Sequence, residues 1–412
     1  MTDIPLKIGM PTSTFLPALG GVEVGLHNIA MRLAARGHSP VVAVPARNLR
    51  DLRQVRNQLP YTLAAFPPKT MTLVHHWPDL GSRWIAACLS RLAHKNGIDI
   101  WHGTIGFPIG VALIRHAAGR TPHLVRCAGE DIQVAPEIGY GMRLNPRIDG
   151  LVRDWLPRAD MLVAITDSVA AEYVKLGVAP DAIRHIPNGV DLERFAADGD
   201  RKATRRRHGI PEDAFMFLSV GRNHPKKGYD DLLKATRKLA DRSNMSFAVV
   251  VAGAGTDALQ SRAEDLAVAD RLHLLGTMGS ADAAINLQLP GDDLVDLYSA
   301  ADAFVFPSHI ETFGIALVEA MAAGLPVVTT NGPGCRDIVA DGRWGEMVPV
   351  ADPYALAEAM DRLMQDSKYR RSRAADASMR AGDFSWDRVV DLYIETYRHI
   401  IEQTHNRERL TP

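Results

Sequence analysis

The sequence predicts two α/β domains, each built on a parallel β-sheet with helices on its faces. Three observations support this fold class. The chain of 412 residues exceeds the roughly 250–300 residues at which single hydrophobic cores stop growing. Short apolar runs alternate with longer amphipathic stretches, as strands and helices do in parallel α/β domains. The alternation also begins twice, on either side of a charged segment at residues 196–212.

From the first series of apolar runs, we assign residues 1–195 to an N-terminal domain. Between its first two strands, residues 23–36 carry apolar side chains at helical spacing, and Gly37 follows as the residue type that commonly ends a helix. We expect the strands at Lys7–Met10, Val41–Val44, Asp99–His102, His123–Arg126, Met161–Ile165 and Ile183–Pro187.

From the second series of apolar runs, we assign residues 213–384 to a C-terminal domain. We interpret residues 196–212, with their RKATRRRHG stretch, as a solvated linker; phosphate binding by its arginines is the alternative. Residues 278–293 are expected to form a loop, and a last helix begins near 384–386. The strands are expected at Phe215–Val220, Phe247–Gly253, Leu272–Leu275, Ala303–Phe306, Val327–Thr330 and Glu346–Val348.

Charge and cysteine content limit the partners and the compartment. The net charge of −1 gives no sign of nucleic-acid binding. Residues 1–120 hold 13 Lys and Arg against 5 Asp and Glu, a net of +8, which indicates a phosphorylated substrate or a membrane surface as partner. The three cysteines lack metal-ligand spacing, and we see no signal peptide or membrane-spanning run, so we expect a cytoplasmic protein.

A basic loop follows the strand Phe215–Val220 in the stretch SVGRNHPKKGYDDLLKA. Ligands bind at the carboxyl ends of parallel strands, where this loop lies. Arg222 and Lys227 are suited to hold a diphosphate there, one as a planar fork and one as a point charge. The alternative interpretation is a solvated basic turn.

A second candidate site lies in PSHIETFGIALVEAMAAGLPVVTTNGPG, residues 307–334. A helix is expected from about residue 313 to 323, so the amides of Phe313, Gly314 and Ile315 would lie at its positive end and suit a phosphate. Glu311 precedes that helix, where its carboxylate reaches the same edge. Glu319, within the helix, suits ribose hydroxyls, with a surface glutamate as the alternative.

A third candidate is the turn GGVE at residues 20–23, between the first strand and the first helix. Gly20 and Gly21 permit close approach of a ligand to the backbone, and the following helix favours an anion. The alternative interpretation is a Gly-Gly turn that binds no ligand.

Together these segments resemble the retaining glycosyltransferases of family 4, which have the two-domain GT-B fold. The matching segments follow the family's order across nearly the whole chain. They are GGVE at 20–23, IPNGVD at 186–191, GR and KKG at 221–228, AGAG at 252–255, ETFGIALVE at 311–319, AMAAGLPVV at 320–328 and FSW at 384–386.

The resemblance implies two Rossmann-like domains facing each other across a cleft, with the helix at residues 385–405 returning to the N-terminal domain. It implies a UDP- or GDP-sugar donor held mainly by the C-terminal domain. Arg222 and Lys227 would hold the diphosphate, Glu311 the donor sugar and Glu319 the ribose. The other expected donor contacts are Gly20, Gly21, Phe313, Gly314, Ile315 and, beside the base, Met278.

The resemblance also implies chemistry that needs no metal ion and no other cofactor. We find no Asp-x-Asp motif: Asp230-Asp231 is interpreted as a helix start and Asp292-Asp293 as part of a loop. The sugar would leave the diphosphate as an oxocarbenium-like species, and Arg222 and Lys227 would stabilise the charge on the leaving group. The acceptor hydroxyl would attack from the same face.

The N-terminal half departs from the family pattern, which affects acceptor recognition most. Where many relatives have two alternating histidines, this chain has His102 and Thr104; where they have His-Gly-x-Asp, it has Ala128-Gly129-Glu130-Asp131. His102 is either a catalytic residue or a packed strand-end histidine. Substitute contacts to the sugar or acceptor are expected from Arg126, Glu130 and Asp131.

The sequence allows alternative interpretations of the acceptor and of membrane contact. Residues 47–56 place an arginine at every third position, which predicts a basic amphipathic helix near Trp77 and Trp84. Such a helix either contacts an anionic membrane, as for a lipopolysaccharide or glycolipid acceptor, or is a solvated helix. A nucleotide-sugar epimerase, a phosphorylase and a catalytically silent scaffold are the rival functions.

Overall fold

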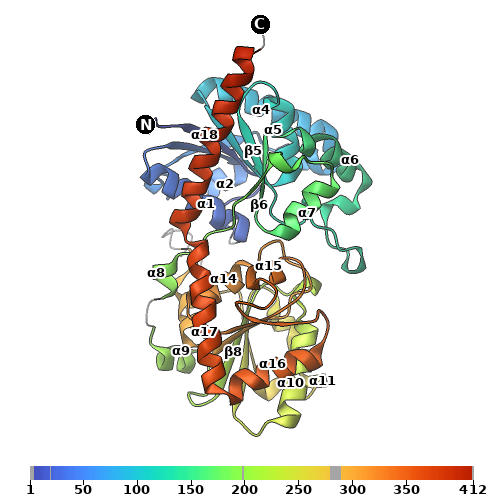
Figure 1. The fold of residues 1–412 in the computed structure, drawn as a ribbon, viewed down its shortest axis with the longest axis vertical. Coiled ribbons are helices and arrows are strands. Elements are labelled where there is room, and N and C mark those ends of the chain that lie inside the picture. Colours follow the sequence, from blue (N-terminus) through green and yellow to red (C-terminus); the bar gives the residue numbers. More distant parts are fainter. Residues whose placement is uncertain (1–3, 19, 197–198, 279–288, 411–412) are drawn as a thin grey trace. The chain divides into compact units, whose positions relative to one another are not determined.

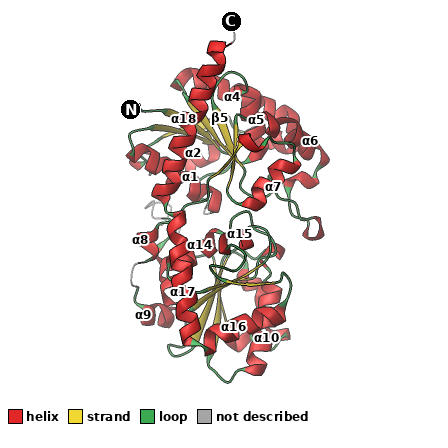
Figure 2. Ribbon diagram, in the orientation of Figure 1, coloured by secondary structure: helices red, strands yellow, loops and turns green. Residues whose placement is uncertain are grey.

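The computed structural model describes residues 4–18, 20–196, 199–278 and 289–410. These residues form two compact units (Figures 1 and 2). The first unit contains residues 4–189 and 386–410, and the second contains the described residues from 190 to 385. Among the described residues, no helix is both long and apolar enough to cross a membrane.

The first unit contains a seven-stranded, entirely parallel sheet in the order β3-β2-β1-β4-β5-β6-β7. Its strands β4, β5 and β6 are buried along their whole length, as expected for a sheet with helices on both faces. The strands are β1 (Lys7–Pro11), β2 (Ser39–Pro45), β3 (Thr62–Phe66), β4 (Ile100–Thr104), β5 (His123–Arg126), β6 (Met161–Ala164) and β7 (Ile183–His185).

The last helix, α18 (Trp386–Leu410), belongs to the first unit and packs on α1 (Gly21–Ala35). Arg36 pairs with Asp387 at 2.9 Å and with Asp391 at 3.1 Å, and the Trp386 ring lies against Gly189. The other helices of this unit are α2 (Ala46–Asp51), α3 (Thr70–His76), α4 (Pro78–Asn96), α5 (Val111–Ala117), α6 (Pro146–Trp155) and α7 (Asp167–Lys175).

The second unit contains a six-stranded parallel sheet in the order β10-β9-β8-β11-β12-β13. Its strands are β8 (Phe215–Val220), β9 (Phe247–Ala252), β10 (Leu272–Gly276), β11 (Ala303–Phe306), β12 (Val327–Thr330) and β13 (Glu346–Val348). Its helices are α8 (Leu192–Phe195), α9 (Arg201–Arg207), α10 (Tyr229–Arg242), α11 (Gln260–Asp265), α13 (Asp292–Ala300), α14 (Ile315–Ala322), α15 (Cys335–Val339), α16 (Pro353–Gln365) and α17 (Ser367–Ala381).

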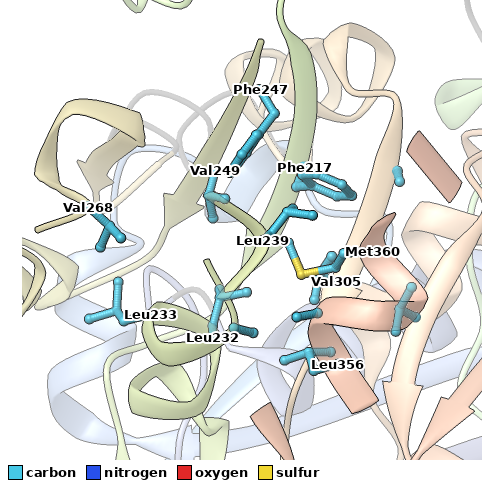
Figure 3. Close-up of a cluster of buried hydrophobic side chains, with 14 of the residues drawn as sticks. Phe217, Leu232, Leu233, Leu239, Phe247, Val249, Val268, Val305, Leu356 and Met360 are labelled. Carbon is cyan, nitrogen blue, oxygen red and sulfur yellow. The ribbon is translucent and has the colours of Figure 1, made fainter. Parts of the chain in front are cut away.

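The core of the second unit fixes the strands that carry the candidate site. Figure 3 shows side chains from β8, β9 and β11 meeting those of α10 and α16. Phe217, Val249 and Val305 supply the sheet side of this cluster, and Leu239 and Met360 supply the helix side. Burying apolar side chains of this size contributes about 1.5–3 kcal/mol each, so the strand ends are anchored.

The segment expected as a linker is instead packed into the second unit. Residues 201–207 form α9, which contacts α13. The Arg205 side chain is 1% exposed and donates to the carbonyl of Ala300 and to the Asp302 carboxylate at 2.8 Å. This arginine therefore has a structural role and is neither solvated nor available to phosphate.

Two further expectations are corrected by the structure. Asp292-Asp293 begins α13 and is not part of a loop, because acidic side chains in a first helical turn complement its positive end; residues 279–288 of the expected loop lie outside the described part. The strand β3 was not predicted, since the sequence TLAAF lies at the sheet edge and is largely half-exposed or exposed.

The arginine-rich segment at residues 47–56 does not form one continuous helix. Helix α2 ends at Asp51, and the chain continues in tight turns in which the amides of Arg53 and Val55 donate to carbonyls three residues earlier. Apolar side chains spaced by three residues match this tighter winding better than an α-helix. Leu52, Val55 and Leu59 are buried, while the four arginines and Trp77 are exposed.

Candidate functional site

The candidate site of the second unit lies at the carboxyl edge of its sheet. Five adjacent strands in the order β10-β9-β8-β11-β12 end there, and each is followed by a loop that carries predicted or motif residues. One residue from each loop illustrates the arrangement: Met278, Gly253, Lys227, Glu311 and Gly334. Parallel α/β sheets bind their ligands at this edge.

The loop after β8 places two basic side chains at this edge. Pro225 begins a short 3-10 turn, the Nδ1 atom of His224 accepts from the Lys226 amide at 3.2 Å, and Gly228, with φ of 65°, ends the turn. The Lys227 ammonium lies 4.6 Å from the centre of the Phe306 ring. Arg222 is exposed and forms no ion pair with any described residue.

Glu311 is held between two lysines. Its Oε1 atom lies 2.6 Å from Lys227 Nζ, and its Oε2 atom lies 3.4 Å from Lys226 Nζ. Burial favours the neutral acid, but the two ammonium groups outweigh it and lower the pKa of Glu311. The carboxylate is therefore ionised and directed to the strand ends, where it is suited to accept hydrogen bonds from sugar hydroxyls.

The loops that carry these residues are joined by their backbones. The His309 amide donates to the Lys226 carbonyl at 2.7 Å, and the Glu311 amide donates to the Pro333 carbonyl at 2.9 Å. A Cβ atom at Gly228 would lie 2.1 Å from the Pro307 carbonyl oxygen, and one at Gly334 would lie 2.1 Å from that of Glu311. The glycines therefore let three loops stack closely enough to bring Lys227 and Glu311 together.

The N-terminus of α14 provides unsatisfied donors beside Glu311. Gly314 precedes the helix with φ of 90°, a conformation that costs glycine little. Within the described part of the chain, no hydrogen bond reaches the amides of Phe313, Gly314 or Ile315. Amides at the positive end of a helix are suited to bind phosphate oxygens.

Glu319 is half-buried in α14 and accepts a hydrogen bond from the Tyr298 hydroxyl at 2.9 Å. Burial raises the pKa of Glu319 to about 7, against the opposing effect of this hydrogen bond. The position is consistent with a ribose ligand, since the carboxyl has one side-chain partner from Tyr298 and lies on the helix that begins at the phosphate-binding amides.

The raised pKa of Glu319 predicts a pH-dependent stability. Between its ordinary value of 4.5 and about 7, the folded protein holds a proton that the unfolded chain has released, so stability falls as pH rises through this window. The loss of stability reaches about 1–3 kcal/mol above pH 7.

Glu319→Gln should remove this dependence of stability on pH in urea unfolding curves measured from pH 4.5 to 8. Exposed Glu358→Gln is the control, and an unchanged slope in Glu319→Gln would contradict the assignment.

In the first unit, Gly20 and Gly21 form the start of α1. Gly20 is the extended residue before the helix, and a Cβ atom there would lie 2.5 Å from Glu23 Oε2. The Thr14 hydroxyl donates to Glu23 Oε1 at 2.6 Å. The turn is therefore compact: a side chain at Gly20 would displace the Glu23 carboxylate from its present position.

The predicted acceptor residues differ in their exposure. Asp131 is buried, and its carboxylate accepts from the amides of Gly106, Ala128 and Gly129 at 2.5, 3.1 and 2.7 Å, so it fixes two loops. Glu130 is exposed. Thr104 and Arg126 are buried neighbours at the ends of β4 and β5.

His102 is fully buried under α18. Its Nδ1 atom lies 2.7 Å from the Tyr397 hydroxyl, and its ring packs on Tyr393 with centroids 4.8 Å apart. Burial, together with the positive charge of Arg126, lowers the pKa of His102 to about 3, so the imidazole is neutral. This environment is that of a packed histidine with no exposed surface.

Four side chains of these sites were not identified from the sequence. Lys226 is adjacent to Lys227 in the KK pair, but the spacing does not show that both reach Glu311. Tyr298 carries no motif, and its pairing with Glu319 depends on the packing of α13 on the sheet. The aromatic spacing in α18 was visible, since Tyr393 and Tyr397 are four residues apart and share a helical face.

Comparisons with known proteins agree with this architecture. Residues 200–379 match the family described as glycosyl transferases group 1, and residues 19–194 match Glycosyltransferase Family 4. The chain is 33% identical over 409 residues to a D-inositol 3-phosphate glycosyltransferase of Geodermatophilus obscurus, which covers 93% of this chain and 86% of the relative.

Two solved structures are similar in fold. A sucrose-phosphate synthase from Thermosynechococcus elongatus has a TM-score of 0.75 and 20% identity, covering 97% of this chain and all of that one. Anabaena HepE in complex with UDP-glucose has a TM-score of 0.73 and 20% identity, covering 96% of this chain and all of that one. The resemblance that the sequence motifs indicated is thereby confirmed, and the chain belongs to the group 1 glycosyltransferases of family 4, enzymes with the GT-B fold.

Proposed function

We propose that this glycosyltransferase moves a hexose from a UDP-sugar to an acceptor hydroxyl, with retention at the anomeric carbon, in the synthesis of a bacterial polysaccharide, lipopolysaccharide or glycolipid. The observation that carries the donor assignment is the convergence of Lys227, Glu311 and the free amides before α14 at one sheet edge. HepE, a structural relative, was solved with UDP-glucose, which supports uridine over the GDP alternative.

The residues at this edge fit the separate parts of such a donor. Lys227 and Arg222 supply positive charge for the diphosphate, and the amides of α14 supply directed donors. Glu311 supplies an ionised acceptor for hydroxyls of the sugar, and the carboxyl of Glu319 is suited to hydrogen-bond those of the ribose. Met278 follows β10 at the edge where the base would lie.

The reaction then needs no protein nucleophile. The bond between the anomeric carbon and the diphosphate breaks as the acceptor oxygen bonds to the same face of that carbon, and a phosphate oxygen takes the acceptor's proton. Lys227, Arg222 and the helix amides stabilise the charge that develops on the leaving diphosphate. Because these groups supply the required positive charge, we propose that transfer proceeds without a divalent metal ion.

Donor binding is tested by thermal unfolding with UDP, GDP and ADP. A nucleotide at about 100 times its Kd should stabilise the protein by about 2.7 kcal/mol, and we expect this for UDP. Arg222→Ala should lose most of the UDP shift, whereas Arg371→Ala, which changes an exposed arginine of α17, should keep it. A shift with GDP alone would replace the proposed base, and no shift with any nucleotide would contradict the proposed function.

The reaction class is tested by product analysis. UDP-glucose and UDP-N-acetylglucosamine are incubated with candidate acceptors, and the anomeric configuration of the product is determined by NMR. We expect an acceptor-dependent glycoside with the donor's configuration. Conversion of the donor sugar without any acceptor would instead support an epimerase.

A further inference from the structure

A second polar cluster lies within the first unit, on one face of its sheet. His102 and Thr104 are two residues apart in β4, so their side chains share a face, and Thr104 is paired in register with Arg126 of β5. From α18, Tyr393 packs on His102. From the loop after β7, Asn188 Oδ1 accepts a hydrogen bond from Arg126.

Arg126 is the unusual member of this cluster. Its side chain is 2% exposed, and its hydrogen bond to the neutral Asn188 leaves Nε and Nη1 without a partner. Within the described part of the chain, it forms no ion pair. A buried charge without a counter-ion is costly, so proteins rarely retain one unless a ligand completes it.

The contrast with Arg205 shows what a structural arginine looks like in the same chain. Arg205 is equally buried, but its three nitrogens donate to backbone carbonyls and it pairs with the Asp302 carboxylate at 2.8 Å. Arg126 has no comparable set of acceptors. Arg115, Arg194 and Arg373 each have a buried Nε atom without a partner, but each of them forms an ion pair. Arg126 differs from them because two of its nitrogens lack a partner and it has no counter-ion among the described residues.

The neighbours of Arg126 add further unpaired groups that are suited to an anion. Thr104 Oγ1, Tyr393 Oη and His102 Nε2 are also buried without a hydrogen-bond partner. Hydroxyls can donate to an anion, and a guanidinium presents two parallel N–H groups to a phosphate or carboxylate. Gly25 of α1 lies across from Arg126 Nη2, and a Cβ atom there would lie 4.0 Å from that nitrogen, at ordinary contact distance.

We propose that Arg126, with Thr104 and Tyr393, binds a phosphate or carboxylate carried by the acceptor. This rests on the proposed function, in which the donor's diphosphate is bound by Arg222, Lys227 and α14 of the second unit. The Arg126 cluster then serves a different anion. It lies at the carboxyl ends of β4 and β5, the edge at which parallel sheets bind ligands. The substrate class is an anionic sugar or polyol.

The first arm of the test measures stability without ligand. Arg126→Met removes a charge that has no native counter-ion, so its melting temperature should equal or exceed that of the wild type. Arg205→Met removes a paired charge and should lower it clearly. If Arg126→Met lost as much as Arg205→Met, Arg126 would be a structural residue and the proposal would be overturned.

The second arm measures binding by calorimetry at fixed ionic strength in the presence of UDP. The probes are glucose 6-phosphate, inositol 3-phosphate and glucuronate, with glucose, inositol and inorganic phosphate as comparison ligands. We expect at least one anionic probe to bind about 10-fold or more tightly than its neutral parent and than inorganic phosphate, because hydrogen bonds between charged groups are stronger than those between neutral groups. Arg126→Met should abolish this preference, and Arg143→Met, which removes a buried arginine paired with Asp149, should keep it.

The outcomes separate this proposal from the donor assignment. Three results would each overturn the proposal that Arg126 binds an anion carried by the acceptor. They are equal binding of charged and neutral probes, a preference for charged probes that persists in Arg126→Met, and binding of inorganic phosphate as tight as that of the anionic probes. Loss of the UDP thermal shift in Arg126→Met would assign the residue to the donor instead. Absence of that shift in the wild type would reject the proposed function itself.

Discussion

Replacing Glu311 by Gln should lower the rate of sugar transfer by about 10²-fold or more, the cost of removing one preorganised polar group from a transition state. The side chain keeps its size but loses the charge that Lys227 contacts at 2.6 Å and Lys226 at 3.4 Å. Two partly buried ammonium groups then lack their counter-ion, and the donor sugar loses an ionised acceptor for its hydroxyls.

The measurement is a steady-state assay of glycoside formation, with UDP binding determined separately by calorimetry. We expect kcat to carry most of the loss, while UDP binds the variant at nearly the wild-type affinity because UDP lacks the sugar. Exposed Glu264→Gln in the same unit is the matched control. Transfer at the wild-type rate by Glu311→Gln would show that this carboxylate does not act on the donor sugar.

The positions of most strands along the chain and the contents of the strand-end loops were predictable from the sequence. Apolar runs such as Phe247–Ala252 and Val327–Thr330 have no competing helical period, and parallel strands bring their following loops to one edge. That geometry alone predicts that the loop with Lys227 lies near the loop with Glu311. The 2.6 Å contact between them and the participation of Lys226 depend on side-chain directions that spacing does not encode.

Other features depend on tertiary packing and could not be predicted. The interpretation of residues 47–56 as one helix followed arginine periodicity, but the buried positions of Leu52 and Val55 favour tighter turns. The RRR run was interpreted from composition, yet Arg205 is buried because Ala300 and Asp302 lie opposite it. A charged side chain is placed by its partners, and those partners are distant in sequence.

Replacing Gly228 by Ala should destabilise the second unit by more than about 3 kcal/mol, because it combines two of the mechanisms that produce large losses. The residue has φ of 65°, and its Cβ atom would lie 2.1 Å from the Pro307 carbonyl oxygen and 3.0 Å from the carbonyl carbon. Both atoms belong to the backbone, so rotation of a side chain cannot relieve this clash. The loop after β8 must then separate from the loop after β11, where the His309 amide now donates to the Lys226 carbonyl.

Gly209→Ala is the matched control for the backbone conformation. Gly209 also has φ of 65°, but no atom lies within 4 Å of its Cβ position, so only the conformational cost of about 1 kcal/mol applies. Urea unfolding monitored by circular dichroism should give a clear difference between the two variants, and transfer should be lost only in Gly228→Ala. Equal stabilities would mean that the Pro307 carbonyl can move aside, and the glycine of the KKG motif would then serve the ligand alone, instead of holding Lys227 against Glu311.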